Sequence, residues 1–184
     1  MLKEVPRDLQ DKVMANALNK VAGQARTRMV RHITTEFDIR RSAVSAQVDL
    51  RRARAGKNLE VRIEAFGRRR KGRSMNVIRF LERSVTFAEA KRRRKGGTLR
   101  ELRFKIKRAG GRRTIAGAFI GNKGRTVFRR RGNERFPIDP VMTIDVPQMF
   151  NTRRINTRVL AFIREQFPAM VERDIQDYLG RAVR

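Results

Sequence analysis

The first third of the chain has the hydrophobic pattern of a helix. Its apolar residues recur every three or four positions, at Met14, Leu18, Val21, Ala25 and Met29, which places them on one helical face. Pro6 and Asp8 suit a first helical turn, because proline needs no N–H partner there and a carboxylate favours the positive end of the helix dipole. The pattern predicts one long amphipathic helix over Arg7–Glu36. Asp38 is a candidate cap for a short second helix over 39–47.

The middle of the chain changes to alternation at every second residue, which predicts β-strands. The predicted strands cover residues 59–65, 102–107, 113–120 and 125–129. Gly117 marks a bulge or a close backbone approach in the third strand. Residues 121–124, Gly-Asn-Lys-Gly, predict a tight hairpin turn between the third and fourth strands. The apolar residues of 75–90 predict partial burial but no definite element type.

The last third becomes helical again after a proline-rich connection. An irregular stretch is expected from Pro137 to Pro147, followed by about 25 residues with helical spacing. The apolar positions are Ile155, Val159, Phe162, Ile163, Phe167, Met170, Val171, Ile175, Tyr178 and Leu179. Pro168 is expected to kink or break this helix, and Gly180 is a natural stop.

These patterns predict an α+β fold. A long N-terminal helix and a C-terminal helix would pack on a small antiparallel sheet with basic loops. We expect a single domain over 1–184. It would have a helical part (1–50), a basic β-rich part (51–135), and a Pro-rich connection with the C-terminal helix (136–184).

The distribution of charged residues indicates more about the partners of the protein than any motif does. The chain has 46 Lys and Arg against 18 Asp and Glu, a net charge of +28. Residues 51–135 contain 30 of the basic and 6 of the acidic side chains. Residues 1–50 contain 9 basic and 6 acidic side chains, and residues 136–184 contain 7 basic and 6 acidic side chains. Such clustering predicts a dedicated surface for an anionic partner.

The candidate contact residues lie in two basic runs and in the predicted strands. They are Arg68, Arg69, Arg70, Lys71, Arg73, Lys91, Arg92, Arg93, Arg94, Lys95, Arg112, Arg113, Arg129, Arg130 and Arg131. The two runs are expected to form exposed loops. Trp is absent, only one Tyr occurs, and no DNA-reading motif is visible. The expected partner is therefore the backbone of duplex DNA, without sequence reading, or an acidic protein surface.

The chain has few side chains of the kinds that form catalytic sites. The chain has no Cys and a single histidine, His32, and the interpretation we favour for His32 is a surface or interface residue. Glu60 and Glu64 flank Arg62, an arrangement that favours local charge compensation over acid–base catalysis. No glycine-rich segment matches a phosphate-binding loop, and no acidic cluster has metal-ligand spacing. We expect no enzyme activity, no cofactor, no membrane span and no signal peptide.

Several short motifs, in order, resemble a known family. They are Ala116-Gly117-Ala118-Phe119-Ile120, Thr126-Val127-Phe128-Arg129-Arg130, Phe136-Pro137-Ile138 and Val146-Pro147-Gln148-Met149-Phe150. Their order and spacing resemble prophage minor tail protein Z, a tail-completion protein of long-tailed bacteriophages. The flanking helices agree with this family. Residues 141–144 depart from it, because the family often has a Gly-Pro pair in this turn.

The resemblance implies a structural virion protein near the upper end of the tail, assembled in the host cytoplasm. It would complete the tail, enable head–tail joining and contact other tail and neck proteins. Six-fold tail symmetry implies a homo-oligomeric ring. The motif positions suit structural roles: Gly117 and Pro137 would fix backbone geometry, and Phe119, Val127 and Ile138 would fill the core. Phe128 and Pro147 complete the structural motif. Two alternatives remain open, a ribosomal or other RNA-associated protein and a tail-assembly chaperone.

Overall fold

The computed structural model describes residues 6–67, 74–82 and 102–182. The chain divides into two compact units. Unit 1 combines Met1–Ile33, Val44–Phe66 and Val146–Arg184, and unit 2 combines Thr34–Ala43 and Gly67–Asp145. The α+β class is confirmed, because two long helices accompany strands that pair only in antiparallel fashion. The expectation of a single domain stays a prediction.

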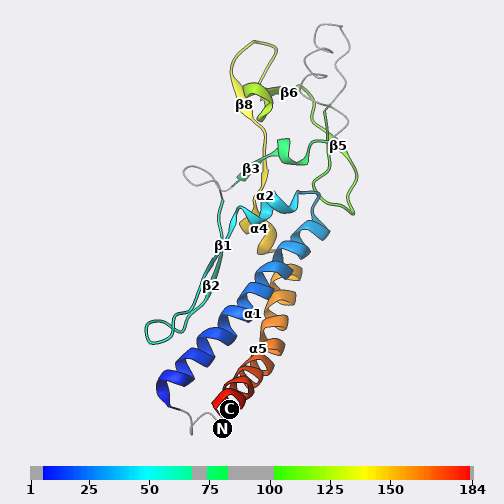
Figure 1. The fold of residues 1–184 in the computed structure, drawn as a ribbon. Helices are drawn as coiled ribbons and strands as arrows, with labels where there is room; N and C mark the ends of the chain where they lie inside the picture. Colours follow the sequence, from blue (N-terminus) through cyan, green and yellow to red (C-terminus); the bar gives the residue numbers. More distant parts are fainter. Residues whose placement is uncertain (1–5, 68–73, 83–101, 183–184) are drawn as a thin grey trace. The chain divides into compact units, whose positions relative to one another are not determined.

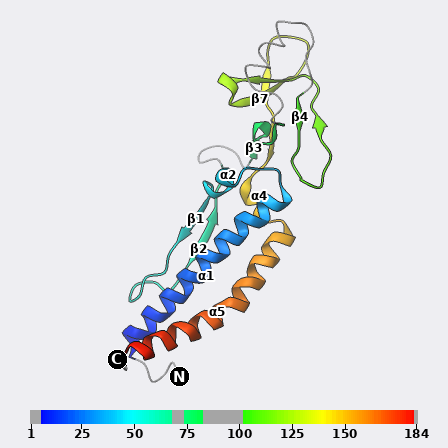
Figure 2. The same cartoon turned by 45° about the vertical axis from the view of Figure 1, so that its right-hand side comes forward.

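Two 30-residue helices form the frame of unit 1. Helix α1 (Arg7–Glu36) has the predicted bounds, and α5 (Arg153–Ala182) runs beside it within this unit (Figures 1 and 2). The Arg28 guanidinium lies 4.0 Å from the centre of the Phe162 ring, and the Lys20 ammonium lies 2.5 Å from an Asp174 oxygen. Since the lower-numbered residue of α1 meets the higher-numbered residue of α5, the two helices are antiparallel.

Small residues let other elements approach α1 closely. Its fully covered positions include four alanines, at Ala15, Ala17, Ala22 and Ala25. The larger members of this face, Met29 and Ile33, have no exposed surface. The predicted apolar stripe is confirmed at Val21, Ala25 and Met29. Met14 and Leu18, which were also predicted, are only half-buried.

Helix α5 has neither the break that was one of the two outcomes expected at Pro168 nor the end expected at Gly180. It continues through Pro168 and past Gly180 to Ala182. Pro168 removes one backbone hydrogen bond, but it lies on an exposed part of the helix, where water can serve the carbonyl left free. Figure 2 shows α5 bent along its length, without a break. Gly180 is tolerated in the helix and does not end it.

A β-hairpin completes unit 1, together with the short helix α4 (Val146–Phe150). Strands β1 (Val48–Arg51) and β2 (Arg62–Ala65) pair with Val48 opposite Ala65. Asn19 of α1 binds this hairpin with both ends of its amide: Nδ2 donates to the Ala53 carbonyl at 3.1 Å, and Oδ1 accepts from the Ala53 N–H at 2.9 Å. Arg26 donates to the Ser45 and Val48 carbonyls. Polar side chains of α1 therefore fix the position of the hairpin.

The sequence prediction was partly wrong in this part of the chain. The second helix, α2, covers only Arg41–Ser45, and the strand after it, β1, was not predicted. Asp38 does not cap α2. Its backbone N–H donates to the Ile106 carbonyl, and its carboxylate faces Arg108. The strand predicted over 59–65 is reduced to β2, because the chain before it belongs to the hairpin loop.

Unit 2 is built from very short strands. They are β3 (Ser74–Asn76), β4 (Arg103–Phe104), β5 (Arg113–Thr114), β6 (Ala118–Gly121), β7 (Thr126–Arg130), β8 (Ile138–Pro140) and β9 (Met142–Ile144). Strands β6, β7 and β8 form a three-stranded sheet, β3 pairs with β9, and β4 pairs with β5. Two single-turn helices accompany them: η2 (Val77–Phe80) follows β3, and η3 (Asn122–Gly124) connects β6 to β7.

Turns shape the strands of unit 2 more than predicted. The strand expected over 113–120 is split, because Ala118 N–H bonds to the Ile115 carbonyl and Gly117 has φ +69°. This left-handed conformation suits glycine, which has no Cβ to clash. The connection expected to be irregular before Pro147 contains β8 and β9. The hairpin turn at 121–124 and the returning strand β7 are confirmed.

One asparagine joins the separate sheets of unit 2. Below β6–β7 lies a small apolar cluster of Val77, Leu102, Phe104 and Val127. Beside it, Asn76 donates from Nδ2 to the Val127 carbonyl at 3.1 Å and accepts on Oδ1 from the Val127 N–H at 3.0 Å. The same Oδ1 accepts from Ile78 N–H and so caps η2. Asn76 thus ties the end of β3 and the start of η2 to Val127 of β7, whose carbonyl also accepts from the Val141 N–H.

Candidate anion- and partner-binding surface

The described candidate residues all belong to unit 2. The two basic runs, residues 68–71 with 73 and residues 91–95, lie outside the described residues. Arg112 and Arg113 lie at the start of β5, whereas Arg129, Arg130 and Arg131 lie at the end of β7. All five are exposed. None of them belongs to the apolar cluster of unit 2.

Arg131 is partly neutralised by a carboxylate. Its guanidinium donates two hydrogen bonds to the Asp139 oxygens, at 2.6 and 3.2 Å. These bonds hold the pKa of Asp139 below its ordinary value and raise the pKa of Arg131. Because the pair is exposed to water and salt, it contributes little to folding. It fixes the orientation of Arg131 and reduces its net attraction for an outside anion.

Arg130 has a structural task within the loop that follows β7. Its Nη1 donates to the backbone carbonyls of Glu134 and Arg135, at 3.2 and 2.6 Å. Its guanidinium also lies 5.2 Å from the centre of the Phe119 ring, within the range of a cation–π contact. Arg130 therefore closes the loop and adds positive charge at a fixed place.

Arg113 and Arg129 are the most available of the five cations. Arg112 makes a 2.8 Å ion pair with Glu82. Among the described residues, the guanidinium groups of Arg113 and Arg129 make no hydrogen bond or ion pair. Arg129 contributes only at longer range, by lowering the pKa of Asp139. These two side chains can bind a phosphate or carboxylate without first losing a partner among the described residues.

The β6–β7–β8 sheet has an aromatic outer face that the sequence analysis missed. Val127 fills the core as predicted, with no exposed surface. Phe119 and Ile138 are only half-buried, and strand alternation puts them on the face opposite Val127. Phe119 and Phe128 stack there, with ring centres 6.0 Å apart. The core roles expected for Phe119 and Ile138 were therefore wrong, and the alternation over Thr126–Arg130 was the signal that separated the two faces.

The remaining motif residues shape the backbone. Gly117 forms the turn before β6, Pro137 follows a cis peptide bond, and Pro147 lies in the first turn of α4. Proline is well tolerated at the start of a helix.

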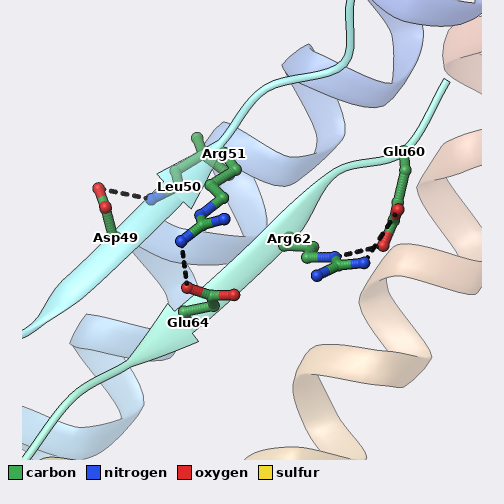
Figure 3. A network of polar contacts seen from close by, with 6 residues as sticks. All are labelled: Asp49, Leu50, Arg51, Glu60, Arg62 and Glu64. Atoms are coloured by element: carbon green, nitrogen blue, oxygen red, sulfur yellow. Dashed lines mark hydrogen bonds and ion pairs between the residues drawn. The ribbon is translucent and has the colours of Figure 1, made fainter. Parts of the chain in front are cut away.

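The acidic residues of the β1–β2 hairpin compensate charge, as expected. Figure 3 shows Arg62 bound to Glu60, with its Nε 2.5 Å from the carboxylate, and Arg51 3.5 Å from Glu64. The hydrogen bond from Arg62 is the main cause that lowers the pKa of Glu60. Each carboxylate faces a cation of its own hairpin, so the two do not form an acid–base pair.

His32 is half-buried on α1, within unit 1. Burial lowers its pKa, and the nearby charges of Arg158, Arg28 and Arg31 lower it further. Within the described parts of the chain, no group of three or more His, Asp or Glu side chains could hold a metal ion. No described helix is long and apolar enough to cross a membrane.

Comparison with known proteins gives one match. The model of the family described as prophage minor tail protein Z matches residues 1–184, the whole chain. Neither the curated proteins nor the solved structures include a match.

Proposed function

Because the chain belongs to the prophage minor tail protein Z family, we propose that it completes the upper end of a bacteriophage tail and enables the tail to join the head. A family of tail proteins makes the chain a structural component of the virion that contacts other virion proteins, and it makes an enzyme unlikely. The match covers the full length, so both units belong to this role.

The distribution of charge supports a contact between unit 2 and an anionic partner. Unit 2 contains 27 Lys and Arg against 8 Asp and Glu, a net +19, whereas unit 1 contains 19 against 10, a net +9. This imbalance is the single observation that carries the proposal. Arg113, Arg129 and the two basic runs are its contact residues.

Two partners fit this surface, and they imply different roles. Contact with the backbone of duplex DNA would hold or position the leading end of the genome, without reading bases. Contact with acidic surfaces of neighbouring tail proteins would instead join successive layers of the tail. DNA is the partner to test first, because each phosphate contact has a defined salt signature.

The test is the salt dependence of duplex DNA binding. Each phosphate contact contributes about −0.9 to the slope of log affinity against log salt. Replacing Arg113 and Arg129 with Ser should flatten this slope by about 2, equally on unrelated sequences. The matched control removes the exposed Arg153 and Arg154 of unit 1 and should leave the slope unchanged.

The basic runs are tested in the same way. Replacing Arg68, Arg69, Arg70, Lys71 and Arg73 with Ser should flatten the slope by about 4. An unchanged slope with normal affinity would reject the DNA role for this run. Tails that bind DNA normally but fail to join heads would instead support docking on acidic proteins.

We further propose that the protein acts as a closed homo-oligomeric ring, six-fold in the virion, since closed symmetry is usual for such assemblies. Images of the tail end that show a single copy, or three-fold symmetry, would contradict the ring. Mass spectrometry of purified virions separates the remaining alternatives. An assembly chaperone would be absent from particles, and an RNA-associated protein would be found with ribosomes.

A further inference from the structure

A polar groove of about 690 Å³ runs along α1 in unit 1. Three cations line it, Lys20, Arg28 and Arg52, together with the amides of Asn16 and Gln24. No carboxylate is among its described lining residues. The groove lies outside the surface to which the proposed function assigns the anionic partner.

Two of the cations are held in place by unit 1 itself. Lys20 binds Asp174 of α5, a carboxylate that is only 3% exposed. Arg28 lies against the Phe162 ring. Side chains that are ordered before binding lose less entropy when a ligand arrives. Because Asp174 compensates Lys20, the net positive charge of the groove comes from Arg28 and Arg52.

Gly23 lies among the groove residues, in the interior of a 30-residue helix. Glycine destabilises a helix interior relative to alanine. A Cβ added at Gly23 would meet no atom within 4 Å, so the fold of the chain itself does not require glycine here. A missing side chain in a groove lets the backbone of a ligand come close to the helix.

We propose that this groove binds an acidic peptide segment of another protein, with carboxylates on Arg28 and Arg52 and with its backbone over Gly23. Arginine binds carboxylates with two parallel hydrogen bonds. The amides of Asn16 and Gln24 offer donors and acceptors that match a peptide backbone. The groove volume is that of a site for a small ligand or short segment. A rigid duplex would reach only its rim, and a second copy of unit 1, with its net positive charge, would be repelled.

Photo-crosslinking tests the site with the full-length protein. A photoreactive amino acid replaces Gln24 in the groove, and a matched protein has it at the exposed Gln176 of α5. The probes are a 14-residue peptide of alternating Glu and Ala and its Gln/Ala counterpart. We expect the Glu/Ala peptide to crosslink at position 24 at least tenfold more than the Gln/Ala peptide, and neither to crosslink at position 176.

Variants distinguish the groove from the basic surface of unit 2. Arg52→Glu should reduce crosslinking of the Glu/Ala peptide about tenfold, whereas Arg113→Glu should leave it unchanged. An equal loss in both variants would overturn the proposal, because the peptide would then be held by unit 2. Crosslinks at position 24 to a 20-base-pair duplex, or between copies of the chain without peptide, would also overturn it.

Gly23→Ala is a second test, in which the thermal stability and the peptide crosslinking should change in opposite directions. Alanine should raise the thermal midpoint of the protein by about 2 °C, because it stabilises α1. The same change should reduce peptide crosslinking several-fold, since the new Cβ fills the floor of the groove. Higher stability with unchanged crosslinking would overturn the close approach of the peptide backbone.

Discussion

The two units of this protein reach a stable fold by different means. Unit 1 contains 18 of the 26 buried apolar side chains of the described residues, and unit 2 contains 8. Unit 1 has two long helices whose apolar faces supply most of its core, whereas the strands of unit 2 are two to five residues long. Unit 2 also has about twice the net charge of unit 1. The more charged unit therefore has the smaller apolar core.

In each unit, one asparagine side chain binds both backbone groups of a residue far away in the sequence. We expect this contact to matter more for the stability of unit 2 than for that of unit 1. Asn19 binds both backbone groups of Ala53, and Asn76 binds both backbone groups of Val127. In unit 1 this contact adds to a large helix–hairpin core. In unit 2 it adds to the pairing of β3 with β9, to the backbone bond from Val141 N–H to the Val127 carbonyl, and to a small apolar cluster. Where apolar area is scarce, satisfied polar contacts determine the arrangement.

The largest effect is expected at Asn76. Asn76→Ala removes three hydrogen bonds to backbone groups and leaves the Val127 N–H without its partner at the edge of the apolar cluster. We expect a loss of about 3 kcal/mol in the free energy of unfolding, concentrated in unit 2. Hydrogen exchange should show faster exchange in β7 and η2, with the exchange of α1 unchanged.

The control for this change is Asn133→Ala, at an exposed residue of the same unit, which should have no measurable effect. If the two alanine variants are equally stable, the amide of Asn76 does not join the sheets of unit 2.

The matching change in unit 1 should have a smaller effect. Asn19→Ala removes two hydrogen bonds, and Ala53 is 5% exposed. We expect a loss of about 2 kcal/mol, measured by chemical denaturation. Asn16→Ala, one turn earlier and exposed, is the control and should be neutral. A larger loss at Asn19 than at Asn76 would reverse the proposed difference between the units.

The sequence predicted the parts of the fold that repeat a period over many residues. Helix α1 was predicted with its observed bounds, because its apolar spacing continues for about eight turns and Pro6 and Asp8 mark its start. Strand β7 and the turn before it were predicted from alternation and from the glycines of 121–124. Strands β1, β8 and β9 were missed, because three or four residues are too few to show a period.

The candidate surface was predicted by charge but not by geometry. Composition located the basic residues, yet it could not show that Arg131 faces Asp139 or that Arg130 closes a loop. Both contacts depend on the pairing of β7 with β8. Asn76 carries no sequence signal, because its partner lies 51 residues away. The groove on α1 was not predicted from the sequence. The net charge of residues 1–50 as a whole is close to zero, and this sum does not show that a few cations gather at one place.

The outer face of the β6–β7–β8 sheet offers a third comparison, between two glycines of unit 2. A Cβ at Gly121 would lie 3.0 Å from two atoms of the Phe128 ring, whereas a Cβ at Gly132 would meet nothing within 4 Å. Gly121→Ala should cost about 1 kcal/mol, since the half-exposed ring can move only in part. Gly132→Ala should be nearly neutral. Thermal unfolding of the two variants tests this, and equal midpoints would show that the Phe119–Phe128 stack adjusts freely.

The smallest effect concerns the pH dependence of unit 1. His32 has a lowered pKa in the folded chain, chiefly because of burial and then because of Arg158, Arg28 and Arg31. Below the ordinary value of 6.5, the unfolded chain therefore binds a proton more readily than the folded chain. Folding stability should then fall as the pH decreases through 6.5 toward the folded-state pKa.

His32→Asn isolates this contribution. Between pH 8 and pH 5 the unchanged protein should lose more of its thermal midpoint than the variant does, by less than about 2 °C because His32 is only half-buried. Carboxylates that titrate over the same range affect both proteins equally and cancel in the difference. Added salt should reduce the difference, since it screens the three arginines. A larger loss in the variant would mean that protonated His32 stabilises unit 1, and the assigned direction of its pKa would be wrong.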